Sequence, residues 1–156
     1  MKYVNTGVVF QEIPDEVTLS INISNCPCHC LGCHSSYLWE DIGEPLNAMS
    51  LGMMLKEYGD DITCVAFMGG DAEPEQVDAL AAWTRKSYPQ LKTAWYSGRT
   101  ELSKAIHLKN FDFVKLGPYV AAKGALKQPT TNQRMYRVEK DKTLTDITSK
   151  FWEGKH

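Results

Sequence analysis

Three things are scarce in this chain: long apolar runs, an excess of charge of one sign, and cysteines outside one short segment. No apolar stretch approaches the roughly 20 residues that a membrane-spanning helix needs, and the charged start of the sequence lacks the apolar core of a secretory signal. Lysine and arginine number 17 against 19 acidic residues, and the basic residues are scattered along the chain. These absences argue against a membrane and against nucleic acid as partners.

The cysteines are distributed very unevenly. Four of the five, Cys26, Cys28, Cys30 and Cys33, are crowded together, and Cys64 lies inside an apolar run. The odd number and the tight spacing do not suit a disulfide framework, but they do suit a metal site in a reducing compartment. We therefore expect a cytoplasmic protein. The 156 residues, 43% of them hydrophobic, predict a single domain over residues 1–156.

Apolar periodicity predicts alternating strands and helices. Residues 17–24 alternate between apolar and polar side chains, as a strand with two different faces should, and 62–68 form a short apolar run typical of a buried parallel strand. Further strands are expected at 93–97, 111–116 and 133–138, helices at 51–58, 74–88 and 100–108, and a loop at 121–132. Ser50 is the expected N-cap of the first helix. This alternation predicts an α/β fold with parallel strands.

Four polar or glycine-containing motifs follow these strands. The cysteine segment follows the first strand, and Gly69-Gly70-Asp71, Ser97-Gly98-Arg99 and Lys115-Leu116-Gly117 stand at the ends of the next three. Because the carboxyl ends of parallel strands meet at one edge of a sheet, we expect these motifs to share a site there. Ser20, Asn22 and Ser24 share one face of the first strand. A closed barrel fills its interior with apolar side chains, so this polar face predicts an open, incomplete barrel with a wet cleft.

Cys26, Cys30 and Cys33 have the spacing C-x3-C-x2-C. Three thiolates on one loop can hold three irons of a [4Fe–4S] cluster and leave the fourth iron open to a substrate or cofactor. The alternative is a structural zinc site with Cys28 as the fourth ligand. Zinc sites usually draw on two separate cysteine or histidine pairs, and no second pair is present, so the spacing favours the iron–sulfur cluster.

The cysteine spacing resembles the signature of the radical S-adenosylmethionine (radical SAM) enzymes. Gly69-Gly70-Asp71 at a strand end resembles the glycine-rich SAM motif of that superfamily. Asn132-Gln133-Arg134, within Pro129-Thr130-Thr131-Asn132-Gln133-Arg134, resembles a segment of the activating proteins for anaerobic (class III) ribonucleoside-triphosphate reductase. These similarities run from about Gln11 to Val138. They imply a single-domain incomplete β/α barrel of the radical SAM type.

The resemblance also implies which residues hold the cofactors. Cys26, Cys30 and Cys33 would bind the [4Fe–4S] cluster, and the SAM-binding residues would be Gly32, His34, Gly69, Gly70, Asp71, Ser97 and Lys115. Many radical SAM enzymes have an aromatic residue where this chain has Gly32, so the adenine contact falls to backbone or to His34. Cys28 is an additional thiol. The motif reads Gly-Gly-Asp-Ala-Glu-Pro, which leaves open whether Asp71 or Glu73 is the relevant acid.

In such a family the expected activity is that of a glycyl radical enzyme activase. The protein would cleave SAM reductively and remove hydrogen from a glycine of the large reductase subunit, with electrons from a donor such as flavodoxin or ferredoxin. No acid–base residue is required, and none is assigned as catalytic. Two alternatives stay open: a radical SAM enzyme with a small-molecule substrate, of the deazapurine synthase type, and a non-catalytic zinc-binding module.

Overall fold

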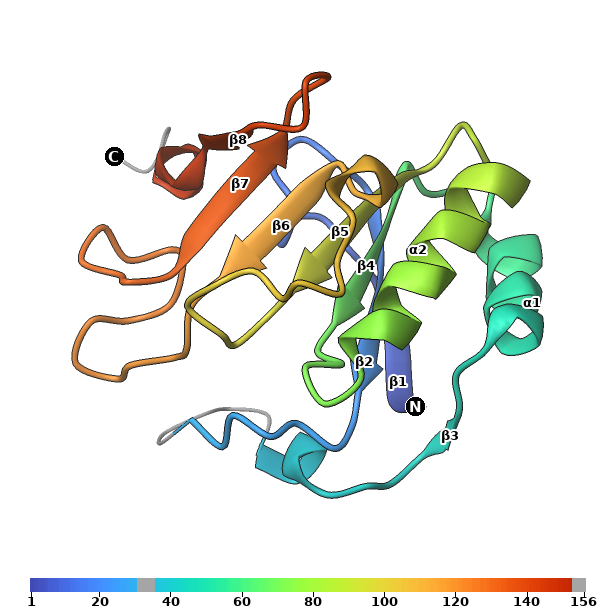
Figure 1. Ribbon diagram of the computed structural model, residues 1–156, viewed down its shortest axis with the longest axis horizontal. Coiled ribbons are helices and arrows are strands. Elements are labelled where there is room, and N and C mark those ends of the chain that lie inside the picture. The colour runs from blue at the N-terminus through green and yellow to red at the C-terminus, as the bar shows by residue number, and fades with distance from the viewer. Residues whose placement is uncertain (31–35, 153–156) are drawn as a thin grey trace.

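The computed structural model describes residues 1–30 and 36–152, and its strands form one eight-stranded sheet (Figure 1). The strands are β1 (Lys2–Val9), β2 (Thr18–Ile23), β3 (Glu44–Pro45), β4 (Cys64–Met68), β5 (Lys92–Tyr96), β6 (Phe113–Leu116), β7 (Arg134–Val138) and β8 (Leu144–Asp146). Their order across the sheet is β3-β1-β2-β4-β5-β6-β7-β8.

The centre of the sheet is parallel and both flanks are antiparallel. β2, β4, β5 and β6 pair in parallel, whereas β1 and β3 on one side and β7 and β8 on the other pair antiparallel. The prediction of an α/β fold with parallel strands is thus confirmed for the centre. The sheet is open, because its outermost strands β3 and β8 are not paired with each other.

Two helices, α1 (Ala48–Tyr58) and α2 (Pro74–Ser87), lie side by side against one face of the sheet (Figure 1). Asn47, not Ser50, is the N-cap of α1: its side chain accepts from the Ser50 backbone N–H, and the Ser50 hydroxyl accepts from the Asn47 N–H. Ser50 is therefore the N3 residue of a capping box, one turn inside the observed cap. Pro74 begins α2, where its missing N–H costs nothing.

Apolar side chains cover both faces of the sheet. Val65, Phe67 and Trp95 pack against the helices, in a core with Leu51 of α1 and Val77 of α2. On the opposite face the core is a smaller cluster under loops and the C-terminal turn, made of Ile13, Cys64, Ala66, Ala94, Phe113, Leu126, Met135, Ile147 and Phe151. Burial on both faces explains why the central strands read as nearly continuous apolar runs.

The helix predicted over 100–108 is wrong. Residues 100–107 form turns and bends, followed by a short 3-10 helix, η2 (Leu108–Asn110). The backbone N–H of His107 donates to Asp78 Oδ1 at 2.8 Å, and His107 Nδ1 lies 2.7 Å from Asp78 Oδ2. In an α-helix, the His107 N–H would donate to the carbonyl four residues earlier. Here it donates to a side chain of α2 instead. Two further 3-10 helices are η1 (Ser36–Trp39) and η3 (Thr148–Phe151).

The polar face of β2 is more buried than the lining of a wet cleft would be. Ser20 and Ser24 are buried, and their hydroxyls donate to the carbonyl oxygens of Gly7 and Ile42, while Asn22 is half-buried. The neighbouring strand β1, which the sequence pattern did not predict, supplies Gly7 and the Asn5 side chain that accepts from Asn22. Neither α1, with 11 residues, nor α2, with 14, is long enough to span a bilayer, and no other helix within 1–30 and 36–152 is either.

Gly52, in the middle of α1, gives a stability prediction. A Cβ there would lie 3.4 Å from the ring of Trp83, an ordinary contact. Gly52→Ala should raise the free energy of unfolding by about 0.5–1 kcal/mol, because alanine loses less backbone entropy in a helix. Gly70→Ala should lower it, since φ is +90° and the new Cβ would meet Val77 at 2.5 Å. Urea unfolding measures both, and a Gly52→Ala variant less stable than wild type would contradict the packing described.

Candidate functional site

The glycine motif after β4 is held in a conformation that requires glycine. Gly69 and Gly70 have φ values of +114° and +90°. The Gly69 N–H donates to the carbonyl of Tyr96, and its carbonyl accepts from the indole N–H of Trp95 at 2.7 Å. These bonds attach the motif to the neighbouring strand β5. The two glycines therefore allow the turn after β4, and the Gly69 backbone connects that turn to β5.

Asp71 connects three of the predicted motifs. Its Oδ1 accepts from the Ser97 hydroxyl at 2.5 Å, and its Oδ2 accepts from the Gly98 N–H at 2.8 Å and from the Cys28 thiol at 3.7 Å. The residue is 8% exposed, so these donors replace most of its contact with water. One carboxylate thus joins the ends of β4 and β5 to the cysteine segment after β2. The convergence expected from the strand ends is present in the described residues.

The structure separates the two acids of the Gly-Gly-Asp-Ala-Glu-Pro motif. Glu73 lies 3.3 Å from the N-terminal ammonium group and accepts a hydrogen bond from Gln76. Its carboxylate therefore faces the start of β1 and the first turn of α2. Asp71, by contrast, lies within the strand-end cluster. Of the two, Asp71 is the acid that this arrangement places at the candidate site.

The start of the cysteine segment is attached by backbone hydrogen bonds to η1 and to the residue that follows it. Asn25 and Cys26 donate to the carbonyls of Glu40 and Leu38, at 2.9 and 2.8 Å. Cys26, Cys28 and Cys30 are all half-buried. The ring of His29 stacks on Trp39 with centroids 4.7 Å apart and planes 9° apart.

Part of the predicted site lies outside the described residues. Gly32, Cys33 and His34 are in this group. Among residues 1–30 and 36–152, no three His, Cys, Asp or Glu side chains are close enough together to hold a metal ion. The described part thus supplies two of the three predicted ligands, Cys26 and Cys30. They are partly accessible thiols, the ligand type that an iron–sulfur cluster takes, so the donor set fits that group as far as it is described.

Cys28 is in a different situation from its neighbours. Burial and the nearby Asp71 carboxylate raise the pKa of Cys28 to about 12, so its thiol remains protonated at neutral pH and can donate to Asp71. It also packs against Gly98: a Cβ at that position would come within 2.8 Å of the Cys28 sulfur. Gly98 therefore permits the close approach of the cysteine segment to the end of β5.

Lys115 is buried at the end of β6, with 7% exposure. Its ammonium donates to the carbonyls of Ser97 and Gly117, at 3.0 and 2.8 Å, and lies 5.7 Å from the centre of the Tyr96 ring. Burial lowers the pKa of Lys115 to about 8, and the negative charge of Asp71 opposes part of that shift. Among the described residues it forms no ion pair, which makes it a buried cation able to meet an anionic group.

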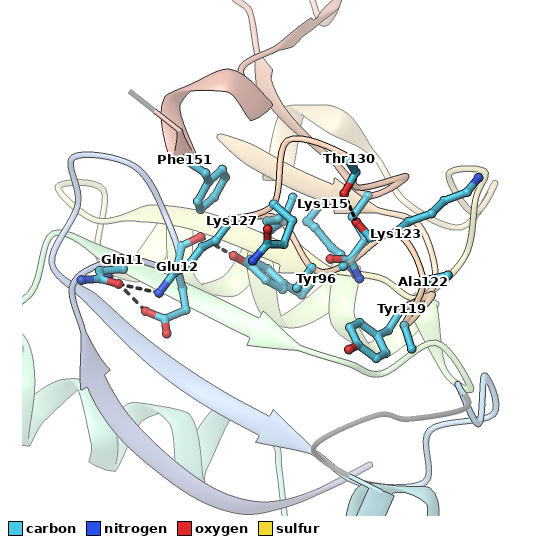
Figure 2. A pocket seen from close by; sticks show the side chains of 16 residues that line it. Gln11, Glu12, Tyr96, Lys115, Tyr119, Ala122, Lys123, Lys127, Thr130 and Phe151 are labelled. Carbon is cyan, nitrogen blue, oxygen red and sulfur yellow. Dashed lines mark hydrogen bonds between the residues drawn. The ribbon is translucent and has the colours of Figure 1, made fainter. Parts of the chain in front are cut away.

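A pocket of about 650 Å³ opens beside Lys115, on the face of the sheet away from the helices (Figure 2). Figure 2 shows Tyr96 and Lys115 between Gln11 and Glu12 on one side and Lys123 and Thr130 on the other. The Tyr96 hydroxyl donates to the Glu12 carbonyl, which attaches the segment after β1 to β5. The pocket therefore adjoins the strand-end site through Lys115.

Sequence reasoning missed two contributors. Trp95 holds the glycine motif through its indole N–H; a tryptophan inside an apolar strand needs a hydrogen-bond partner, and that need was the available signal. The other contributor is the segment of Gln11 and Glu12, which lines the adjoining pocket; β1 pairs with β2 and leads to it, and no local pattern indicated this.

Comparison with protein-family models, with curated proteins and with solved structures finds no match to this chain. Function is therefore inferred from the strand-end site and from the sequence motifs. The predicted residues that the structure brings together are Asp71, Ser97 and Lys115, with Gly69 and Gly70 beside them.

The lowered pKa of Lys115 predicts a pH-dependent stability. The unfolded chain keeps this proton up to about pH 10.5 but the folded protein only up to about 8, so unfolding takes up a proton between these values. Relative to Lys115→Met, the wild-type free energy of unfolding should therefore rise by about 3 kcal/mol from pH 8 to 10.5. Below pH 8 Lys115 is charged in both the folded and the unfolded state, so the cost of burying its charge lowers the free energy of unfolding in full. Urea unfolding across this range measures it; a constant difference between the two proteins would show an unshifted lysine.

Proposed function

We propose that this protein is a radical SAM activating enzyme, which forms the glycyl radical of class III anaerobic ribonucleoside-triphosphate reductase. The supporting observation is the Asp71 cluster. It joins the glycine motif, Ser97-Gly98 and the cysteine segment at the carboxyl edge of the parallel strands. In open α/β sheets, ligands bind at this edge. The motifs that resemble the superfamily thus meet where one ligand could contact all of them.

The proposed fold is an incomplete β/α barrel of the radical SAM type. It is supported by the four parallel central strands, the helices on one face and the open edges. An open sheet suits an enzyme that acts on a macromolecule, because a large partner can then reach the cofactor. The reducing chemistry and free thiols suit the cytoplasm.

In the proposed site, Cys26 and Cys30, with Cys33, hold a [4Fe–4S] cluster. Gly69, Gly70, Asp71, Ser97 and Lys115, with Gly32 and His34, surround SAM. When bound, these cofactors would supply the one-electron reductive cleavage of SAM, with methionine as the leaving group, and so the hydrogen abstraction from the partner's glycine. The protein's own residues bind and orient: Asp71 offers negative charge to the SAM amino group, and Lys115 offers positive charge to its carboxylate. An electron donor such as flavodoxin or ferredoxin completes the system.

A second candidate is a radical SAM enzyme with a small-molecule substrate. The pocket beside Lys115 favours it, because about 650 Å³ is within the usual range for small ligands. The two candidates differ in where the radical ends: on a partner polypeptide or on a small product.

The cysteines give the first test. Cys26→Ala, Cys30→Ala and Cys33→Ala should each lose most of the iron after anaerobic reconstitution, because a second iron then lacks a protein ligand. Cys28→Ala is the matched control and should keep its iron, since the Cys28 thiol contacts Asp71. Iron, sulfide and zinc analysis with the visible spectrum measures this. A colourless protein that binds zinc through all four thiols would instead support the zinc-binding module.

The partner gives the second test. Reconstituted protein, SAM and a strong reductant, mixed with the large subunit of a class III reductase, should produce a glycyl radical signal in electron paramagnetic resonance. The Cys30→Ala protein, treated identically, should produce none. SAM cleavage without any glycyl radical on the reductase would reject the activase and leave the small-molecule enzyme as the better reading.

A further inference from the structure

A second hollow continues the pocket beside Lys115. It has a volume of about 380 Å³, and it shares Gln11, Lys127 and Phe151 with the larger pocket. The Lys127 ammonium donates to the Gln11 side chain at 2.5 Å, across the boundary between the two. Together they form a groove between residues 10–15 and the 119–133 segment, which we name the lysine groove. Phe10, which is 68% exposed, is one of the residues that line the smaller hollow.

The lysine groove concentrates positive charge on a chain whose net charge is −2. Lys115, Lys123 and Lys127 line its larger part, with Glu12 as the acidic residue there. In the smaller part Lys150 is paired with Asp15 at 3.3 Å. None of the first three lysines forms an ion pair with a described residue. Lys115 is buried at the strand-end site, whereas Lys123 and Lys127 are exposed, so the charge of these two is available to an anionic ligand.

The shape and the polar groups of the groove fit a polypeptide segment. Two hollows in a row suit an elongated ligand better than a compact one. Gln128 and Gln133 line the larger hollow, and an amide side chain offers both a donor and an acceptor, as a peptide backbone requires. The exposed Phe10 ring adds apolar area to the smaller hollow.

We propose that the lysine groove binds an extended, acidic segment of a partner polypeptide. This inference rests on the proposed function in one respect: the partner would be the glycyl radical enzyme, docked through a segment away from its target glycine. Lys115 lines the groove and also donates to the Ser97 carbonyl of the strand-end site, so a segment bound in the groove lies beside that site. Recognition itself requires neither iron nor SAM.

A binding experiment with purified protein tests the proposal. The probe is a short fluorescein-labelled peptide of alternating glutamate and glycine, and its glutamine counterpart is the neutral control. Fluorescence anisotropy should show saturable binding of the glutamate peptide. Lys123→Glu and Lys127→Glu should each weaken that binding roughly fivefold or more, because each reverses a charge in the groove. Lys86→Glu makes the same change at an exposed position on α2, across the sheet, and should alter the affinity by less than about twofold.

Three results would contradict the proposal that the lysine groove binds an acidic segment. They are no saturable binding of the glutamate peptide, equal affinity for the glutamine peptide, or equal weakening of binding by Lys86→Glu. Thermal unfolding by circular dichroism checks that the variants are folded. If losing the Gln11 bond unfolds Lys127→Glu, the exposed Lys123→Glu decides alone. Because the assay contains no cofactor, its failure would leave the radical chemistry untouched, and failure of glycyl radical formation would leave peptide binding intact.

Discussion

The carboxylate of Asp71 is the interaction on which the strand-end site depends. A buried carboxylate is costly unless donors replace the water it loses, and here Ser97, Gly98 and Cys28 supply them. Each donor belongs to a segment that follows a parallel strand at this edge of the sheet. The same bonds therefore satisfy the charge and set the positions of the loops. Lys115, anchored to the Ser97 carbonyl, brings a positive charge to the same cluster.

The arrangement of parallel and antiparallel strands determines where the strand-end site lies in the sheet. The four parallel strands bring their carboxyl ends together, and the sheet stays open because β3 and β8, the outermost strands of the two antiparallel flanks, are not paired with each other. In the described part of the chain, the α-helices α1 and α2 lie against one face. The other face is covered by loops and η3 over a smaller core, and the lysine groove lies between those loops. A partner could thus reach the strand ends from the side without helices.

The strand-end site and the lysine groove differ in how deeply their charged groups are buried. At the strand ends, buried Asp71 and Lys115 lie within one cluster and suit a ligand that carries both an ammonium and a carboxylate group, as SAM does. Along the groove, exposed lysines favour an acidic chain and tolerate water. Buried charges select a small ligand by geometry, whereas exposed ones mainly attract and orient a larger partner.

The central strands, α2 and the motifs at the strand ends could be predicted from the sequence, because apolar periodicity and glycine or proline boundaries are local signals. The pairing of β1 with β2, the burial of Ser20 and Ser24, and the position of Gln11 and Glu12 in the pocket became visible in the folded protein alone. The same is true of residues 100–107, which form turns bonded to Asp78 instead of the expected helix. It is also true of the two acids of the glycine motif: Asp71 lies in the strand-end cluster, whereas Glu73 lies beside the N-terminal ammonium group. Each of these outcomes depends on a hydrogen bond or strand pairing between residues far apart in the chain, and no local pattern encodes such a partner.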